Sequence, residues 1–136
     1  MKNFESRRVT LKATQHIVYT FLSDMSNLGR FMPEQITNWQ ATEDTCSFTI
    51  QNMTTLSMRI IERVPFERID VTSDGKTPFN FTLHLKLFPH TETQSEACFI
   101  LNADLNPVFS MMASKPLQNL VDLMATNLEK YYSVSV

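Results

Sequence analysis

Glycine is almost missing from this chain. Gly29 and Gly75 are the only two glycines among 136 residues, whereas glycine makes up about 7% of an average protein. Loops that cradle a phosphate group with backbone N–H groups depend on closely spaced glycines. The sequence therefore excludes a P-loop and a dinucleotide-binding turn.

Cysteine and positive charge are also scarce. Cys46 and Cys98 are far apart, and no histidine lies at a ligand spacing from either, so zinc or redox chemistry has little support. We predict two reduced thiols in strands, on opposite faces of the sheet, and no cofactor or metal. The formal net charge of −2 and the pI near 5.9 give no reason to expect nucleic acid or anionic lipid as a partner.

Long apolar runs are absent as well. No stretch approaches the ~20 apolar residues of a membrane span, and the charged N-terminus lacks the apolar segment of a secretory signal, so we expect a cytoplasmic protein. Hydrophobic residues nevertheless make up 43% of the chain and charged residues only 19%. This composition excludes disorder and predicts a generous apolar interior, and the length fits one domain over residues 1–136.

Hydrophobic spacing predicts a strand, two short helices, six strands and a long helix. Residues 4–11 read as an edge strand, and a second short helix over 27–32 ends before Pro33. Between residues 35 and 105 the period changes to two, most clearly over 79–87 and 95–105. The first helix is capped by Thr14, and its predicted buried face is formed by Ile17, Val18, Phe21, Leu22 and Met25.

The last helix has a clear start signal. Asn106 is a favourable N-cap, and Pro107 follows at the first helical position, where its missing N–H costs nothing. Apolar residues then recur at helical spacing up to Tyr131 and form one stripe. Pro116 removes one backbone hydrogen bond, so we expect a bend near it and not an end. The sheet and this helix each have one apolar face, and each supplies the cover that the other needs.

The order of elements and two segments resemble the START and birch-pollen-allergen-like superfamily, often called SRPBCC, and look closest to its small bacterial members. The segments are ATQHIVYTFLSDMSNLGRFMP and DLNPVFSMMASKPLQNLVDLMATNLEKY. The resemblance covers essentially the whole chain. It implies an α+β helix-grip fold, in which a seven-stranded antiparallel curved sheet wraps around a long C-terminal helix, with two short helices after the first strand.

The same resemblance implies a cavity between sheet and helix, which in many relatives admits a lipid, a polyketide or another hydrophobic compound. Mapped onto this sequence, the predicted lining consists of Phe48, Ile50, Leu56, Met58, Phe79, Phe81, Phe99, Leu101, Met112, Leu120 and Met124. Trp39 is placed at the rim of such a pocket, at a partner surface or in ordinary packing.

Three functions stay open at this level. The first is a carrier or sensor that encloses an apolar ligand without changing it. The second is an enzyme of the cyclase or dehydratase type found among the relatives, which needs polar groups aimed into the cavity. The third is a protein-docking module with a filled core, and a homodimer also stays open. The side chains considered for the enzyme are Asn38, Gln40, Ser95 and Tyr19, and no catalytic residue is predicted.

Most charged side chains favour structural roles. The three histidines have no spacing that brings them together, and we predict solvated or capping roles for His16, His84 and His90. Three acids lie out of phase with the inward residues of their strands and are placed on a solvated outer face: Asp70, Glu96 and Asp104. Outer-face ion pairs with Glu62 and Glu67 are expected for Arg7, Arg8, Arg59 and Arg63.

Overall fold

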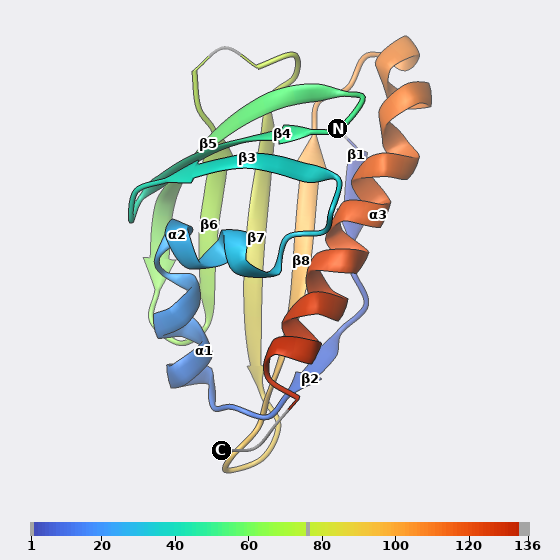
Figure 1. Cartoon of the computed structure of the whole chain (residues 1–136). Helices are drawn as coiled ribbons and strands as arrows, with labels where there is room; N and C mark the ends of the chain where they lie inside the picture. The colour runs from blue at the N-terminus through green and yellow to red at the C-terminus, as the bar shows by residue number, and fades with distance from the viewer. Residues whose placement is uncertain (1, 76, 134–136) are drawn as a thin grey trace.

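The computed structural model describes residues 2–75 and 77–133 and consists of one antiparallel sheet curved around a long helix (Figure 1). The strands are β1 (Lys2–Glu5), β2 (Val9–Leu11), β3 (Ile36–Ala41), β4 (Thr45–Ile50), β5 (Thr54–Val64), β6 (Arg68–Ser73), β7 (Phe81–Pro89) and β8 (Ser95–Ala103). The helices are α1 (Gln15–Leu22), α2 (Met25–Leu28), the 3-10 turn η1 (Gly29–Phe31) and α3 (Pro107–Tyr131). The strand order is β1-β8-β7-β6-β5-β4-β3, with β2 also paired to β8. The predicted α+β helix-grip fold is confirmed.

The predicted first strand is two strands in the structure. Between the register pairs Glu5–Ile100 and Val9–Ala97, the three residues 6–8 face the two residues 98–99, which is a bulge. Ser6 holds it together, because its N–H donates to the Phe99 carbonyl and its Oγ accepts from the Phe99 N–H, both at 2.9 Å. Within the described residues, the sheet therefore has eight strands in seven positions.

The short helices begin at the side chains that cap them. Thr14 Oγ1 accepts from the Ile17 N–H at 3.3 Å, as predicted for the first helix. Asp24 Oδ1 accepts from the Ser26 N–H at 2.9 Å, so Met25 starts α2 and does not end α1. Ile17 was expected on the buried face but is half exposed, because the short helix turns only Val18 and Leu22 into the core.

The long helix α3 runs through Pro116 without a break, and the bend expected there stays a prediction. Its N-cap is confirmed, since Asn106 Oδ1 accepts from the Phe109 N–H at 2.7 Å. Figure 1 shows α3 packed along the sheet beside β8 and β1. The helices α1 and α2 and the turn η1 lie on the same face of the sheet, farther from β1. The helix turns inward Ala113, Leu117, Leu120, Val121, Met124, Ala125 and Leu128.

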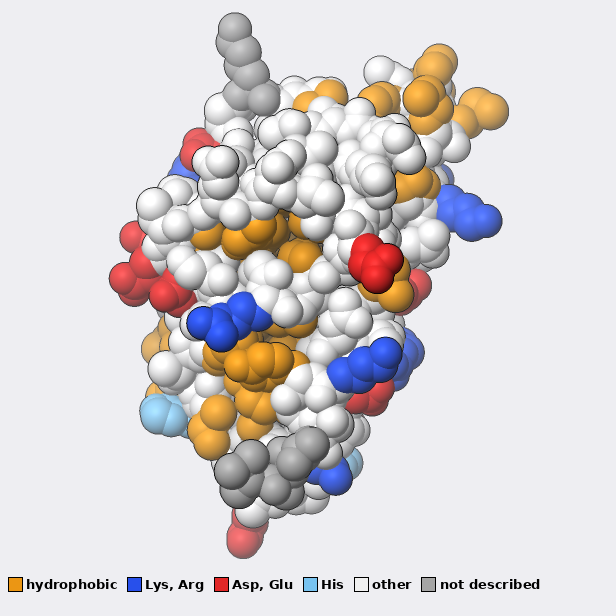
Figure 2. Space-filling view, in the orientation of Figure 1, with side chains coloured by type: hydrophobic (Ala, Val, Ile, Leu, Met, Phe, Trp, Pro, Cys, Tyr) orange, Lys and Arg blue, Asp and Glu red, His pale blue; other side chains and the backbone are white. Residues whose placement is uncertain are grey.

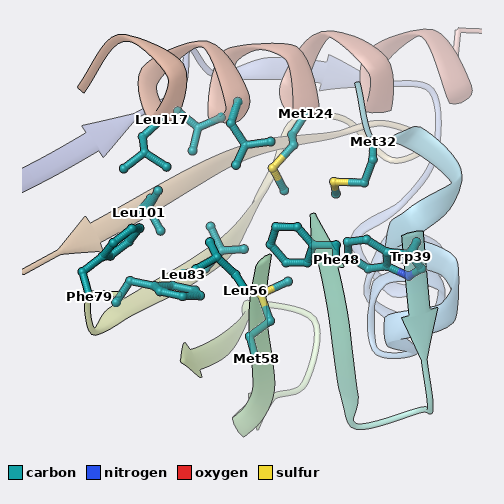
Figure 3. A pocket seen from close by; sticks show the side chains of 13 residues that line it. Met32, Trp39, Phe48, Leu56, Met58, Phe79, Leu83, Leu101, Leu117 and Met124 are labelled. Carbon is teal, nitrogen blue, oxygen red and sulfur yellow. The ribbon is translucent and has the colours of Figure 1, made fainter. Parts of the chain in front are cut away.

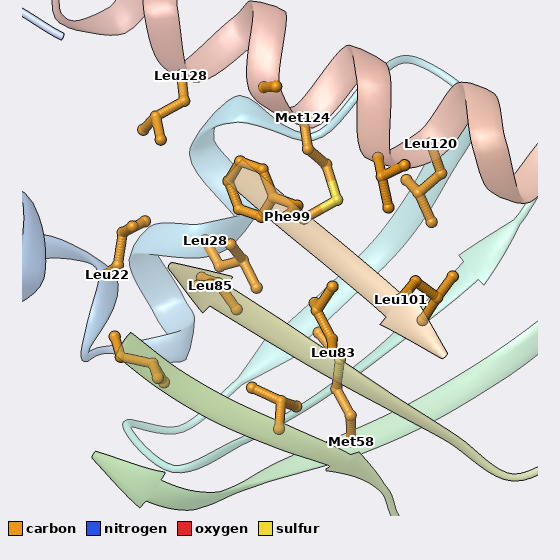
Figure 4. Packing of buried hydrophobic residues seen from close by; sticks show 14 of the residues in the cluster. Leu22, Leu28, Met58, Leu83, Leu85, Phe99, Leu101, Leu120, Met124 and Leu128 are labelled. Carbon is orange, nitrogen blue, oxygen red and sulfur yellow. The ribbon is translucent and has the colours of Figure 1, made fainter. Parts of the chain in front are cut away.

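One hydrophobic core joins the sheet to α3. Alternate residues of β7 and β8 are buried, in the phase predicted from the sequence. Figure 4 shows Phe99 and Leu83 on the strands facing Met124 on the helix. The strand boundaries differ slightly from the prediction, because β7 starts at Phe81 and β8 ends at Ala103.

The outer ion pairs use other partners than the sequence suggested. Arg7 pairs with Glu129, Arg8 with Glu96, Arg59 with Asp74 and Arg63 with Asp44. The prediction that these four arginines pair with Glu62 and Glu67 was therefore wrong, because other carboxylates lie nearer to them and Glu62 lies beside Arg68 instead. Such exposed pairs contribute about 0–1 kcal/mol each, so they do not determine the fold.

Phe81→Ala should lower the free energy of unfolding by about 3–5 kcal/mol, because it leaves a cavity between β7 and α3. Met111→Ala is the matched control, since the Met111 side chain is 88% exposed, and it should change stability by less than about 0.5 kcal/mol. Urea denaturation measures both variants. A Phe81 variant as stable as the control would show that the inward face of β7 has been assigned wrongly.

Both thiols should be free but slow to react. Cys46 and Cys98 are buried and unpaired. Burial raises the pKa of Cys46 to about 12, against a weaker opposing effect of the Met58 backbone, and burial also raises the pKa of Cys98. Since the thiolate is the reactive form, a thiol reagent should label both residues rapidly only after unfolding. Monomer purified without reductant that yields no thiol when unfolded would contradict this expectation.

Candidate functional site

A narrow pocket lies between the curved sheet and α3 (Figure 3). Its walls come from β3, β4, β5, β7, β8 and α3. Two further residues lie in the connecting segments, Met32 before β3 and Phe79 before β7. All thirteen lining residues are hydrophobic: Met32, Trp39, Phe48, Leu56, Met58, Phe79, Phe81, Leu83, Leu101, Leu117, Leu120, Val121 and Met124. No lining side chain can exchange a proton near neutral pH.

The pocket is small as it stands. A water-sized sphere can occupy about 20 Å³ of it, which is room for about one water molecule. Figure 3 shows Met32 and Met124 reaching toward Phe48 and Trp39, with Met58 on the sheet side. Methionine side chains are unbranched and adapt their shape easily. A larger ligand therefore requires these side chains to move.

Trp39 forms the wall at one end of the pocket. Its ring stacks on Phe48 with 5.2 Å between centroids, and its Nε1–H donates to the Met25 carbonyl at 3.2 Å. A Cβ added to Gly29 would lie 2.5 Å from Trp39 Cδ1, so the ring rests directly on this glycine. Trp39 thus combines two of the roles considered from the sequence, since it lines the pocket and packs against the core.

The opposite end of the pocket is aromatic. Phe79 lies 5.8 Å from Phe81 and 5.4 Å from Phe109, measured between ring centroids. Phe109 belongs to the first turns of α3, where Val108, Met111 and Met112 are exposed. This end of the pocket is therefore separated from the protein surface by a few side chains.

The structure brings together eight of the eleven residues predicted as lining: Phe48, Leu56, Met58, Phe79, Phe81, Leu101, Leu120 and Met124. Ile50 and Phe99 are buried in other parts of the core, and Phe99 packs on Phe31 at 6.2 Å. Met112 is 70% exposed and lies outside the pocket. The inward stripe of α3 passes through Ala113, and the neighbouring residue is turned away by about 100°.

Four lining residues were missed, and a fifth, Trp39, was considered only for the rim of the pocket. Leu83, Leu117 and Val121 share the spacing of the residues that were chosen, so the sequence contained a signal for them. Met32 precedes Pro33 in an irregular segment, and Trp39 lies within the bulge of β3 between Thr37 and Gln40. Neither position has a periodic signal. Contact of any of these side chains with a ligand stays a prediction.

The four polar residues considered for an enzyme lie away from the pocket. Ser95 is fully buried but donates its hydroxyl to the Ala13 carbonyl at 2.8 Å. Asn38 is exposed and has a positive φ of 55°, and Tyr19 packs on Phe66. Neither these residues nor Gln40 belong to the lining. The pocket has no group for acid or base catalysis among them.

Two further observations concern the described part of the chain. Across residues 2–75 and 77–133, no helix is long and apolar enough to cross a membrane. The same residues contain no group of three or more His, Cys, Asp or Glu side chains placed to hold a metal ion.

Solved bacterial structures share this architecture over nearly the whole chain. No protein-family model and no curated protein matches the sequence. A solution structure from Thermobifida fusca is 20% identical, with a TM-score of 0.71 over 98% of this chain and 94% of that one. XoxI from Bacillus cereus is 12% identical, with a TM-score of 0.77 over 98% and 96% of the two chains.

A structure described as a START superfamily protein, from Mycobacterium smegmatis, is also similar. It is 12% identical, with a TM-score of 0.69 over 96% of this chain and 97% of that one. Identities this low establish the fold and not the activity. The chain therefore has the START-type fold, which confirms the resemblance found in its sequence.

Gly29→Ala should displace the Trp39 ring, because the added methyl group has no space beneath it. We expect a red-shifted fluorescence spectrum, since Trp39 is the only tryptophan, and a loss of stability of about 1–3 kcal/mol. Gly75→Ala is the control, because its Cβ would meet nothing within 4 Å. Its positive φ costs some stability, but the emission should not change. A folded Gly29 variant with wild-type emission would contradict the contact.

Proposed function

We propose that this protein binds a small hydrophobic ligand in the cytoplasm, of the lipid, isoprenoid or polyketide-like class, without changing it chemically. The observation that carries this proposal is the lining of thirteen hydrophobic side chains between sheet and α3. Burial of apolar surface favours such a ligand, while the lack of polar groups leaves it only loosely oriented. A carrier or a sensor needs no more than this.

Binding requires the pocket to open. The segment formed by α2 and η1 is tied to α3 by one side-chain hydrogen bond, in which Asn127 Nδ2 donates to the Phe31 carbonyl at 2.9 Å. Met32 follows directly on this segment, and Trp39 rests on Gly29 within it. In Figure 2, hydrophobic side chains are visible between β3 and the α2–η1 segment. A movement of this segment away from α3 would release Met32 and admit a ligand from that side.

The enzyme alternative has less support. A cyclase or dehydratase needs an acid, a base or an oriented polar group next to its substrate. The residues lining the pocket offer none of these. An enzyme of this kind would need a group brought in by the ligand or by another protein.

A protein-docking module is the second candidate, and two observations favour it. The pocket between sheet and α3 holds space for about one water, and the first turns of α3 expose Val108, Met111 and Met112. A filled core with an exposed apolar helix end suits a protein partner. The two candidates differ in whether an apolar compound enters the core.

A thermal-shift screen with fatty acids, sterols, isoprenoids and aromatic polyketides tests the proposal. A ligand held only by the folded state should raise the melting temperature, because a hundredfold excess over Kd adds about 2.7 kcal/mol to the free energy of unfolding. Met124→Ala removes one side chain that the ligand must displace, so it should bind the same compounds more tightly than the wild type. Met111→Ala, an equal truncation at the surface, should leave the affinity unchanged.

Each variant is compared with its own ligand-free form, because Met124→Ala also costs about 2–5 kcal/mol of stability. Bound compounds should in addition change the Trp39 fluorescence, which places them in the pocket and not on the exposed end of α3. If no compound stabilises either the wild type or the Met124 variant, the carrier function fails and the docking module takes its place.

A further inference from the structure

A small open hollow lies on the surface beside the apolar pocket. It is formed by the segment before β3 and by α3, and its lining consists of Pro33, Glu34, Gln35, Leu123 and Asn127. A water-sized sphere can occupy about 260 Å³ of it, which is room for several water molecules. The hollow is therefore large enough for the polar end of a small amphiphile.

The hollow and the pocket share one wall. On the segment before β3, Met32 lines the pocket and the next residue, Pro33, lines the hollow. On α3, Met124 lines the pocket and the preceding residue, Leu123, lines the hollow. Figure 3 shows Met32 and Met124 reaching into the pocket from these two segments. A ligand that passes between the two methionines therefore joins the hollow to the pocket.

The hollow carries the polar groups that the pocket lacks. Asn127 gives one amide N–H to the Phe31 carbonyl at 2.9 Å, which leaves its second N–H and its side-chain oxygen for a ligand. Gln35 is held by its backbone, whose carbonyl accepts from the Gln51 N–H at 2.8 Å, and its side-chain amide makes no bond within the described chain. Glu34 adds an exposed carboxylate. The hollow therefore offers both donors and acceptors.

We propose that this hollow receives the neutral hydroxyl headgroup of an amphiphilic ligand, a long-chain or isoprenoid alcohol, whose tail fills the apolar pocket. The headgroup site presupposes the hydrophobic ligand proposed above and fixes which end of it stays outside. A polar group inside the pocket would lose its hydrogen bonds to water without replacing them, which is strongly unfavourable. A hydroxyl group in the hollow can donate to the Glu34 carboxylate and accept from the Gln35 amide.

The charge of Glu34 disfavours an acidic headgroup. Glu34 is the one ionisable residue of the lining, and the nearest basic residues along the two segments, Arg30 on η1 and Lys130 on α3, lie outside it. A carboxylate or phosphate group in the hollow would therefore contact a like charge. All three side chains are exposed, so water and salt weaken the repulsion. The hollow discriminates between headgroups by a small factor and not absolutely.

Decanol and decanoate are the test probes, because their chains are equally long and only decanoate carries a charge at about pH 8. Titrations followed by Trp39 fluorescence report entry into the pocket, since Trp39 lines it. Decanol should bind more tightly than decanoate. In two-dimensional NMR, decanol should shift the side-chain amide signals of Gln35 and Asn127, whereas the signal of the exposed Asn3 on β1 should not move.

Glu34→Gln removes the charge of the hollow and keeps the size of the side chain. It should raise the affinity for decanoate relative to decanol about two- to fivefold, which is the scale of an exposed charge contact. Glu92→Gln is the matched control, because it removes an exposed charge in the turn between β7 and β8. The ratio of the two affinities should stay as in the wild type.

The possible failures separate the headgroup site from the carrier function. If neither compound changes the Trp39 fluorescence, the headgroup site and the carrier function fail together. The headgroup site alone is wrong if both compounds change the fluorescence while the amide signals of Gln35 and Asn127 stay in place. It is also wrong if Glu34→Gln leaves the affinity ratio unchanged, or if Glu92→Gln changes it equally. In these cases the ligand enters the pocket with its headgroup elsewhere.

Discussion

The packing of α3 against the concave face of the sheet is the contact on which the rest of the structure depends. Neither partner can be stable alone, because each presents a row of large hydrophobic side chains. The sheet must curve to reach the helix along its length, and α1, α2 and η1 cover what the helix leaves open. The pocket is the part of this contact where methionines and aromatic rings lie among the leucines of the sheet and the helix.

Most of the fold could be predicted from local patterns in the sequence. Alternation defined β7 and β8, and the Asn106–Pro107 pair defined the start of α3, because both signals lie within a few residues of the chain. The split of the first strand was not readable. It depends on Ser6 replacing a backbone acceptor for Phe99, a residue 93 positions away, and the sequence does not encode such a pairing in any spacing.

The candidate sites were readable in part, for the same reason. The strand residues of the pocket could be predicted from their alternation. Met112 was misplaced by one position of the helix. The orientation of the Trp39 ring depends on its contact with Gly29, which no spacing in the sequence indicates. His84 and Asp70 were expected to be separate solvated groups. Their bond depends on the register between β6 and β7, which is set by the connections between strands and not by composition.

The alternation of Leu83 and His84 means that the apolar pocket and the bond between His84 and Asp70 share a single register of β7. A shift of this strand by one residue would exchange its two faces: the imidazole of His84 and the ammonium group of Lys86 would enter the apolar interior, and the leucines would reach the solvent. An insertion or deletion of one residue within β7 would therefore damage the apolar pocket and the Asp70–His84 bond together. Substitutions on one face of β7 can leave the other face intact, so the two faces are free to vary separately only while the length of this strand is kept.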